Sequence, residues 1–95
     1  MPEMRFLVRW PDGSRDDCYS PSLVVKDFLA PGTAYRLDDF LARSRAALTI
    51  ASDRVEARYG TPCSRALRQL AQIEARGKAF ADNPDAEIVC DGFLE

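Results

Sequence analysis

Three cysteines are the side chains best suited to covalent chemistry in this chain, because the sequence contains no histidine. Histidine is the usual general base near neutral pH and the commonest metal ligand. Its absence excludes Ser-His-Asp, Cys-His and histidine-metal sites built from this chain alone. Cys18, Cys63 and Cys90 are odd in number and widely spaced, which argues against a disulfide framework and a zinc site and favours reduced thiols.

Cys63 and Cys18 are the two candidates for a reactive thiol. Cys63 is expected in the first turn of a helix, where the helix dipole favours the thiolate form. The alternative, which we favour, is that Cys63 packs inward as a small hydrophobic side chain. Cys18 and Cys90 lie in predicted strands, where they could be neighbours in the sheet and where core packing is again favoured. We therefore expect no catalytic residue, no metal and no cofactor.

A second candidate site lies where a polar strand meets a helix start. Ser20 is predicted to cap a helix that has Pro21 at its first position. Tyr19, Ser20, Ser22 and Lys26 would place hydroxyl groups and an amine around free backbone N–H groups, which could bind a small anion. The alternative is an ordinary capped helix after an edge strand, and we favour it.

The third candidate is a stripe of arginines on the longest predicted helix. Arg43, Arg54 and Arg58 lie on one flank of this helix, and Ile50 adds an apolar residue that points away from the predicted core. Arginine beside small apolar residues suits a protein interface. The alternative is a solvated face, in which Asp39 pairs with Arg43 at i,i+4 spacing.

Short strands are predicted near both ends of the chain. Residues Met4 to Trp10 alternate apolar and polar side chains, which is typical of a strand with one buried face. Turn residues 11–14 and a second strand over Arg15 to Tyr19 complete a hairpin. A final short strand is predicted over Glu87 to about Cys90. Residues 21–29 fit either a short helix or a third strand, because two adjacent valines compete with the helix signal.

Two long helices are predicted between the strands. The first runs from about Asp38 to about Tyr59, with Gly60 as its C′ residue, and the second starts at Thr61-Pro62. Each should bury one stripe of residues: Leu37, Phe40, Leu41, Ser44, Leu48, Ala51, Val55 and Tyr59 on the first, and Cys63, Ala66, Leu67, Leu70, Ile73, Gly77 and Phe80 on the second.

The composition predicts one soluble α+β domain over residues 1–95. The hydrophobic share is 46%, the charged share is 29% and the net charge is −2, which favours neither nucleic acid nor a membrane as a partner. The start of the chain lacks a secretory signal pattern, so a cytoplasmic location is expected. The predicted fold is a small antiparallel sheet, made of the N-terminal hairpin and the C-terminal strand, packed on two long helices, with a short helix after the hairpin.

Several runs of the sequence resemble a family of small bacterial nitrogen-starvation response proteins. These runs are residues 1–6, 8–14, 18–27, 47–52, 59–60 and 63–67, and the likeness weakens after about Ile73. The resemblance implies a gene cluster that encodes a nitrilase, a radical-SAM protein, an acetyltransferase-like protein and a flavin-dependent oxidoreductase, linked to nitrile or cyanide assimilation. It provides no catalytic residue to assign.

The sequence and the resemblance together favour a non-catalytic accessory or interaction protein. We expect a protein partner from the same gene cluster, and a homodimer is compatible with the polar edge strand and with Ile50. The alternative function is a small-molecule binding protein that uses the helix start between Ser20 and Lys26. A cysteine-dependent enzyme is the least favoured interpretation.

Overall fold

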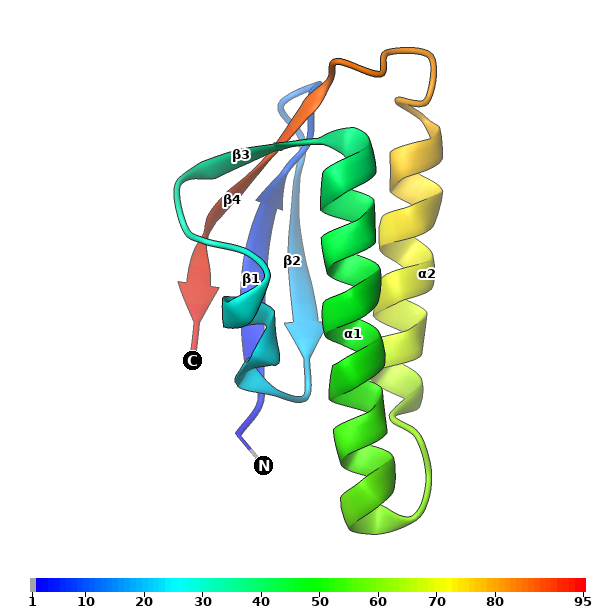
Figure 1. Ribbon diagram of the computed structural model, residues 1–95. Helices are drawn as coiled ribbons and strands as arrows, with labels where there is room; N and C mark the ends of the chain where they lie inside the picture. The colour runs from blue at the N-terminus through cyan, green and yellow to red at the C-terminus, as the bar shows by residue number, and fades with distance from the viewer. Residues whose placement is uncertain (1) are drawn as a thin grey trace.

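The computed structural model describes residues 2–95, which form four strands and three helical segments (Figure 1). Their order is β1 (Met4–Arg9), β2 (Arg15–Ser20), the 3-10 helix η1 (Leu23–Asp27), β3 (Thr33–Arg36), α1 (Leu37–Tyr59), α2 (Ser64–Lys78) and β4 (Glu87–Leu94). The predicted α+β class, the hairpin and the two long helices are confirmed.

All strand pairs in the sheet are antiparallel, in the order β2-β1-β4-β3. The alternation in β1 has the predicted effect, because Met4, Phe6 and Val8 are buried while Arg5 and Arg9 are exposed. The β1–β2 turn has Gly13 at a φ of 86°, a conformation that glycine adopts at no steric cost. β2 is an edge strand, as its polar sequence predicts.

The sequence interpretation missed β3, which continues directly into α1. β3 has only four residues, of which Tyr35 alone is buried, so it is too short to show the alternation on which strand prediction depends. The segment is a strand because it pairs with β4, with Thr33 opposite Cys90 and Arg36 opposite Glu87. β4 itself extends to Leu94 rather than ending near Cys90, because its second half pairs with β1 across a β-bulge.

The segment after the hairpin is helical, which resolves the open choice for residues 21–29. It forms η1, with Val24 and Val25 buried. The N-cap is Ser22 and not Ser20, because Ser20 is still the last residue of β2. The hydroxyl of Ser22 accepts a hydrogen bond from the Val24 N–H at 3.3 Å, which is the usual role of an N-cap side chain.

Helix α1 is longer than the sheet that it covers. Its 23 residues span about 34 Å at 1.5 Å per residue, whereas six-residue strands span about 20 Å. Its buried residues therefore end at Ser52, and Tyr59, predicted to face the core, is 63% exposed. Gly60 ends the helix in the left-handed conformation at a φ of 89°, as predicted. Residues 53–59 of α1, here called the overhang, project beyond the strands (Figure 1).

Helix α2 starts at Ser64, so the predicted start at Thr61-Pro62 is wrong. The N-cap is Cys63, in an extended conformation, because the chain uses residues 61–63 to turn back after Gly60 and run antiparallel to α1. Leu67, predicted to be buried, is 44% exposed, whereas Ala66, Leu70, Ile73 and Gly77 are buried as predicted.

The core lies between one face of the sheet and the two helices. Trp10 is only 2% exposed. It packs edge-on against Phe40 of α1 and stacks on Phe80 after α2.

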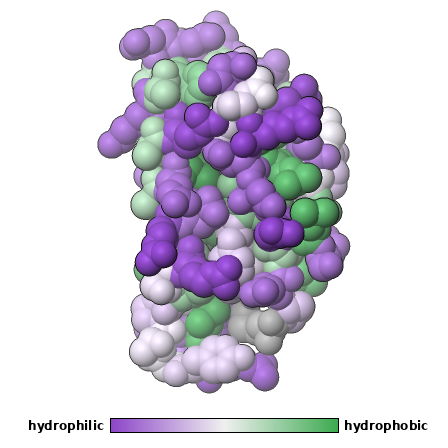
Figure 2. Space-filling model, turned by 180° about the vertical axis from the view of Figure 1, so that it is seen from behind, coloured by the Kyte–Doolittle hydropathy of each residue, from purple (hydrophilic) through white to green (hydrophobic). Residues whose placement is uncertain are grey.

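The surface seen from behind, in a view turned by 180° from that of Figure 1, carries mostly hydrophilic residues with hydrophobic ones between them (Figure 2). Within residues 2–95, no helix has the length and apolar character needed to cross a lipid bilayer.

Candidate functional site

The four residues predicted to bind an anion do not face one common site. Ser20 and Ser22 are buried and bond to each other, the Ser20 hydroxyl donating to the Ser22 carbonyl at 2.7 Å. The Lys26 ammonium instead donates to Glu95 Oε2 at 2.8 Å. Tyr19 points to the other side of its strand from Ser20, as neighbouring residues in a strand do.

Tyr19 lies under the guanidinium of Arg65, which is 3.8 Å from the centre of its ring. The Tyr19 N–H donates to Gln69 Oε1 at 3.0 Å, so α2 covers part of the free edge of β2. Burial raises the pKa of the Tyr19 phenol, nearby Cys63 adds to the rise, and Arg65 opposes it. The contacts with Arg65 and Gln69 attach α2 to the sheet.

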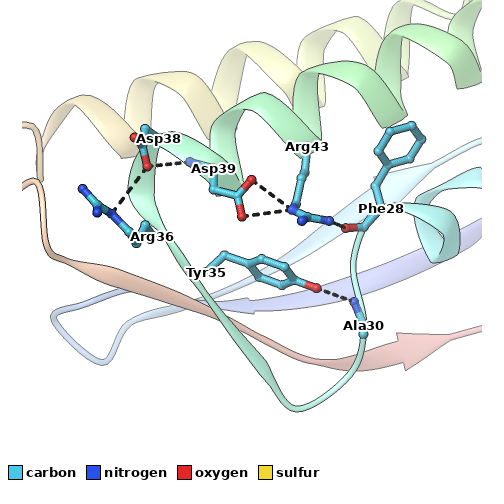
Figure 3. Close-up of polar contacts among 7 residues, drawn as sticks. All are labelled: Phe28, Ala30, Tyr35, Arg36, Asp38, Asp39 and Arg43. Carbon is cyan, nitrogen blue, oxygen red and sulfur yellow. Dashed lines mark hydrogen bonds and ion pairs between the residues drawn. The ribbon is translucent and has the colours of Figure 1, made fainter.

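Two of the three arginines predicted to bind a partner form hydrogen bonds within the protein's own chain. Arg43 Nε donates to both carboxylate oxygens of Asp39 at 3.0 Å, which confirms that predicted pair, and its Nη1 donates to the Phe28 carbonyl at 2.8 Å. Arg43 also lies 5.0 Å from the centre of the Tyr35 ring, and the Tyr35 hydroxyl accepts from the Ala30 N–H (Figure 3). Arg43 therefore holds the segment that follows η1.

Arg54 binds the other end of the same segment. Its Nη1 donates to the Ser22 hydroxyl at 3.0 Å, so Arg43 and Arg54 hold the two ends of η1 against α1. Ile50 lies between them in sequence and is half-buried, while Arg58 is exposed one turn beyond Arg54. Arg58 lies 5.7 Å from the centre of the Tyr59 ring.

Arg54 and Arg58 border a groove between the overhang and η1. Its volume is about 510 Å³, and we call it the helix-end groove. The lining residues are Pro2, Ser22, Leu23, Arg54, Ala57 and Arg58. The groove thus combines one residue of the predicted anion site with two residues of the predicted partner site. The sequence did not predict this combination, because Ser22 and Arg54 are 32 positions apart.

Burial makes Cys18 and Cys90 poor nucleophiles. Burial raises the pKa of the Cys18 thiol to about 12, with Asp16 and Asp17 adding to the rise, and burial also raises the pKa of Cys90. The two are not on neighbouring strands, because β1 lies between β2 and β4. Cys63 is half-buried at the start of α2, where its N–H donates to Ser52 Oγ at 3.1 Å. No group of three or more potential metal-ligating side chains occurs within residues 2–95.

The opposite end of the helix pair holds a cluster that the sequence interpretation did not identify. We call it the hairpin clamp, and it consists of Trp10, Ser14, Asp16, Arg76 and Phe80. Asp16 Oδ2 accepts from Trp10 Nε1 at 2.8 Å and from Arg76 Nε at 3.0 Å, and Arg76 also bonds to the Ser14 hydroxyl. The one available signal was Trp10, because a buried indole N–H needs an acceptor.

Comparison with known proteins identifies one family. The model of that family, described as nitrogen starvation-induced protein NitG, matches residues 5–93. No curated protein and no solved structure matches the chain. The family match spans nearly the whole fold, from β1 to the end of β4, and includes every residue of the hairpin clamp. The chain therefore belongs to the NitG family of nitrogen starvation-induced proteins.

Proposed function

We propose that this protein is a non-catalytic accessory protein of the nitrogen-starvation response, which binds an enzyme encoded in its own gene cluster beside a nitrilase and a radical-SAM protein. The family description supports the setting in nitrogen starvation. The gene cluster and the accessory role rest on the sequence resemblance and on the surface described next.

The observation that carries this proposal is the exposed hydrophobic surface at the overhang end. Within residues 2–95, three large hydrophobic side chains are clearly exposed: Tyr59 at 63%, Leu67 at 44% and Leu94 at 44%. Tyr59 ends α1 and Leu67 lies in the first turn of α2, so these two lie at the end where α1 turns back into α2, whereas Leu94 lies apart from them at the end of β4 (Figure 1). Exposed apolar side chains gathered in one region are typical of protein interaction sites.

The charges at this end indicate the chemistry of the partner. Arg54 and Arg58 have no carboxylate within 4.0 Å among the described residues, whereas most other arginines do. Tyrosine and arginine are also the residue types that contribute most to binding energy at interfaces. The complementary partner surface is an acidic segment with apolar side chains, and cluster enzymes with such a segment are the expected partners.

The test is affinity purification of the tagged protein from nitrogen-starved cells, with mass spectrometry of what is recovered. We expect near-stoichiometric recovery of one cluster enzyme, and loss of that enzyme with the double variant Tyr59→Ala, Arg58→Glu. Lys78→Glu is the matched control, because Lys78 is also exposed, forms no ion pair within residues 2–95 and lies at the opposite end of α2.

Two results would overturn the proposal. One is recovery of the protein alone from cells in which the neighbouring gene products are present. The other is equal loss of the enzyme with Lys78→Glu, because that would indicate a general charge effect rather than a surface at the overhang. Circular dichroism of each variant establishes that the fold is intact.

A further inference from the structure

The helix-end groove contains an unbalanced positive charge. Arg54 and Arg58 lie four residues apart on α1, so they are neighbours on one side of the helix, where like charges repel. Asp53 and Glu56 are close in sequence, but neither lies within 4.0 Å of these guanidinium groups in an ion pair recorded for residues 2–95. Both side chains line the groove, so their charge favours an anion there.

One of the two arginines is already held in position. Arg54 Nη1 donates to Ser22 Oγ, and Ser22 is only 4% exposed and is fixed as the N-cap of η1. A guanidinium group has five N–H donors, so Arg54 retains donors for a bound oxyanion. Because its side chain is already ordered, binding would lose little conformational freedom.

The rest of the groove is apolar. Pro2, Leu23 and Ala57 form its hydrocarbon lining. Its volume of about 510 Å³ falls within the range of small-molecule sites, which are mostly apolar with a few convergent polar groups. A ligand that fits both parts has a charged head for the arginines and a short hydrocarbon body for Leu23 and Ala57.

We propose that the helix-end groove is a binding site for a small molecule with an oxyanion head, a carboxylate or a phosphate, on a short apolar body. Arg54 and Arg58 bind the head, the Ser22 hydroxyl positions Arg54, and Leu23 and Ala57 contact the body. The site belongs to the isolated protein, so this inference goes beyond the accessory role and does not depend on it.

The experiment is a titration of the ¹⁵N-labelled protein followed by two-dimensional NMR, with hexanoate and hexyl phosphate as the two probes. We expect saturable shifts at residues 22–23 and 54–58 with at least one probe, and the tighter probe identifies the preferred head. Hexanamide has the same body without the charge, and acetate has the charge without the body, so each should bind about tenfold more weakly or not at all.

Variants connect the binding to the groove. Arg58→Gln removes one cation without breaking a hydrogen bond recorded for the folded chain, and it should weaken binding about tenfold. Arg54→Gln should do the same but also releases Ser22, so Arg58→Gln is the decisive variant. The matched control is Arg68→Gln, which should bind the probe as well as the unaltered protein does.

The proposal is overturned if neither probe produces saturable shifts in the groove. It is also overturned if hexanamide binds as tightly as the tighter of the two probes, or if Arg68→Gln weakens binding as much as Arg58→Gln. A partner-binding defect in Tyr59→Ala would not affect this test, because Tyr59 does not line the groove.

Discussion

The two ends of the helix pair use arginine in opposite ways. In the hairpin clamp, Arg76 is paired with Asp16 and lies 5.2 Å from the centre of the Trp10 ring, so its charge is neutralised within the fold. At the overhang end, Arg54 binds only a neutral hydroxyl and Arg58 contacts only an aromatic ring. The comparison separates an end that stabilises the fold from an end whose charges are available to a ligand or partner.

Substitution of Trp10 provides the strongest test of this difference between the two ends. Trp10→Ala removes a side chain that is 2% exposed and packed on Phe40 and Phe80, and it should lower the free energy of unfolding by about 3–5 kcal/mol. Tyr59→Ala, at the overhang, should change it by less than about 0.5 kcal/mol. Urea unfolding followed by circular dichroism measures both variants.

If Trp10→Ala does not fold, Trp10→Phe retains one aromatic ring but removes the second ring and the N–H that donates to Asp16 Oδ2. Its expected cost is about 2–3 kcal/mol, because the smaller ring leaves a cavity and the hydrogen bond is lost. Equal effects of the tryptophan and tyrosine variants would contradict the division of the molecule into a stabilising end and an available end.

The buried thiol of Cys18 makes the stability of the fold depend on pH. The pKa of Cys18 is raised to about 12 in the folded protein from an ordinary 9.0, so the stability contributed by its protonated form is present below pH 9 and is lost as the pH rises toward 12. The loss is about 1.4 kcal/mol per pH unit. Cys18→Ala should remove this part of the alkaline slope, whereas the part due to Cys90, whose pKa is also raised by burial, should remain. The measurement is the free energy of unfolding at several pH values between about 9 and about 11. An unchanged slope in Cys18→Ala would contradict this prediction.

Arg76 tests the polar part of the hairpin clamp. Its side chain is 35% exposed and that of Asp16 is 40% exposed, so solvent weakens their attraction. Arg76→Gln should therefore lower the free energy of unfolding by about 1 kcal/mol. A double-mutant cycle with Asp16→Asn isolates the pair, and a coupling energy of zero would mean that only the rings hold this end together.

Arg58 should give the smallest effect and the opposite sign. Arg58→Gln removes a like charge four residues from Arg54, so it should raise the free energy of unfolding by about 0.2–0.5 kcal/mol. High salt should abolish the gain, because it screens exposed charges. A measurable loss of stability would indicate that Arg58 contributes to the fold and is not free to bind.

Prediction from the sequence succeeded where the signal is local. The alternation in β1, the stop at Gly60 and the Asp39–Arg43 pair each involve residues within a few positions of one another. Prediction failed for β3, the start of α2 and the exposure of Tyr59. Each of these depends on a partner segment: β4 for β3, the turn after Gly60 for α2, and the length of the sheet for Tyr59.

The sequence by itself determined the N-terminal hairpin, the two long helices, the turn at Gly13 and the absence of histidine chemistry, because these follow from residue identity and local spacing. Only the tertiary structure decided that Arg54 meets Ser22 and that Arg76 meets Asp16, which are 32 and 60 positions apart. A guanidinium group can bind any oxygen acceptor, so its residue type does not specify its partner. The packing of η1 and of α2 against the rest of the chain determines the partners of Arg54 and Arg76. It also leaves Arg58 beside an open groove.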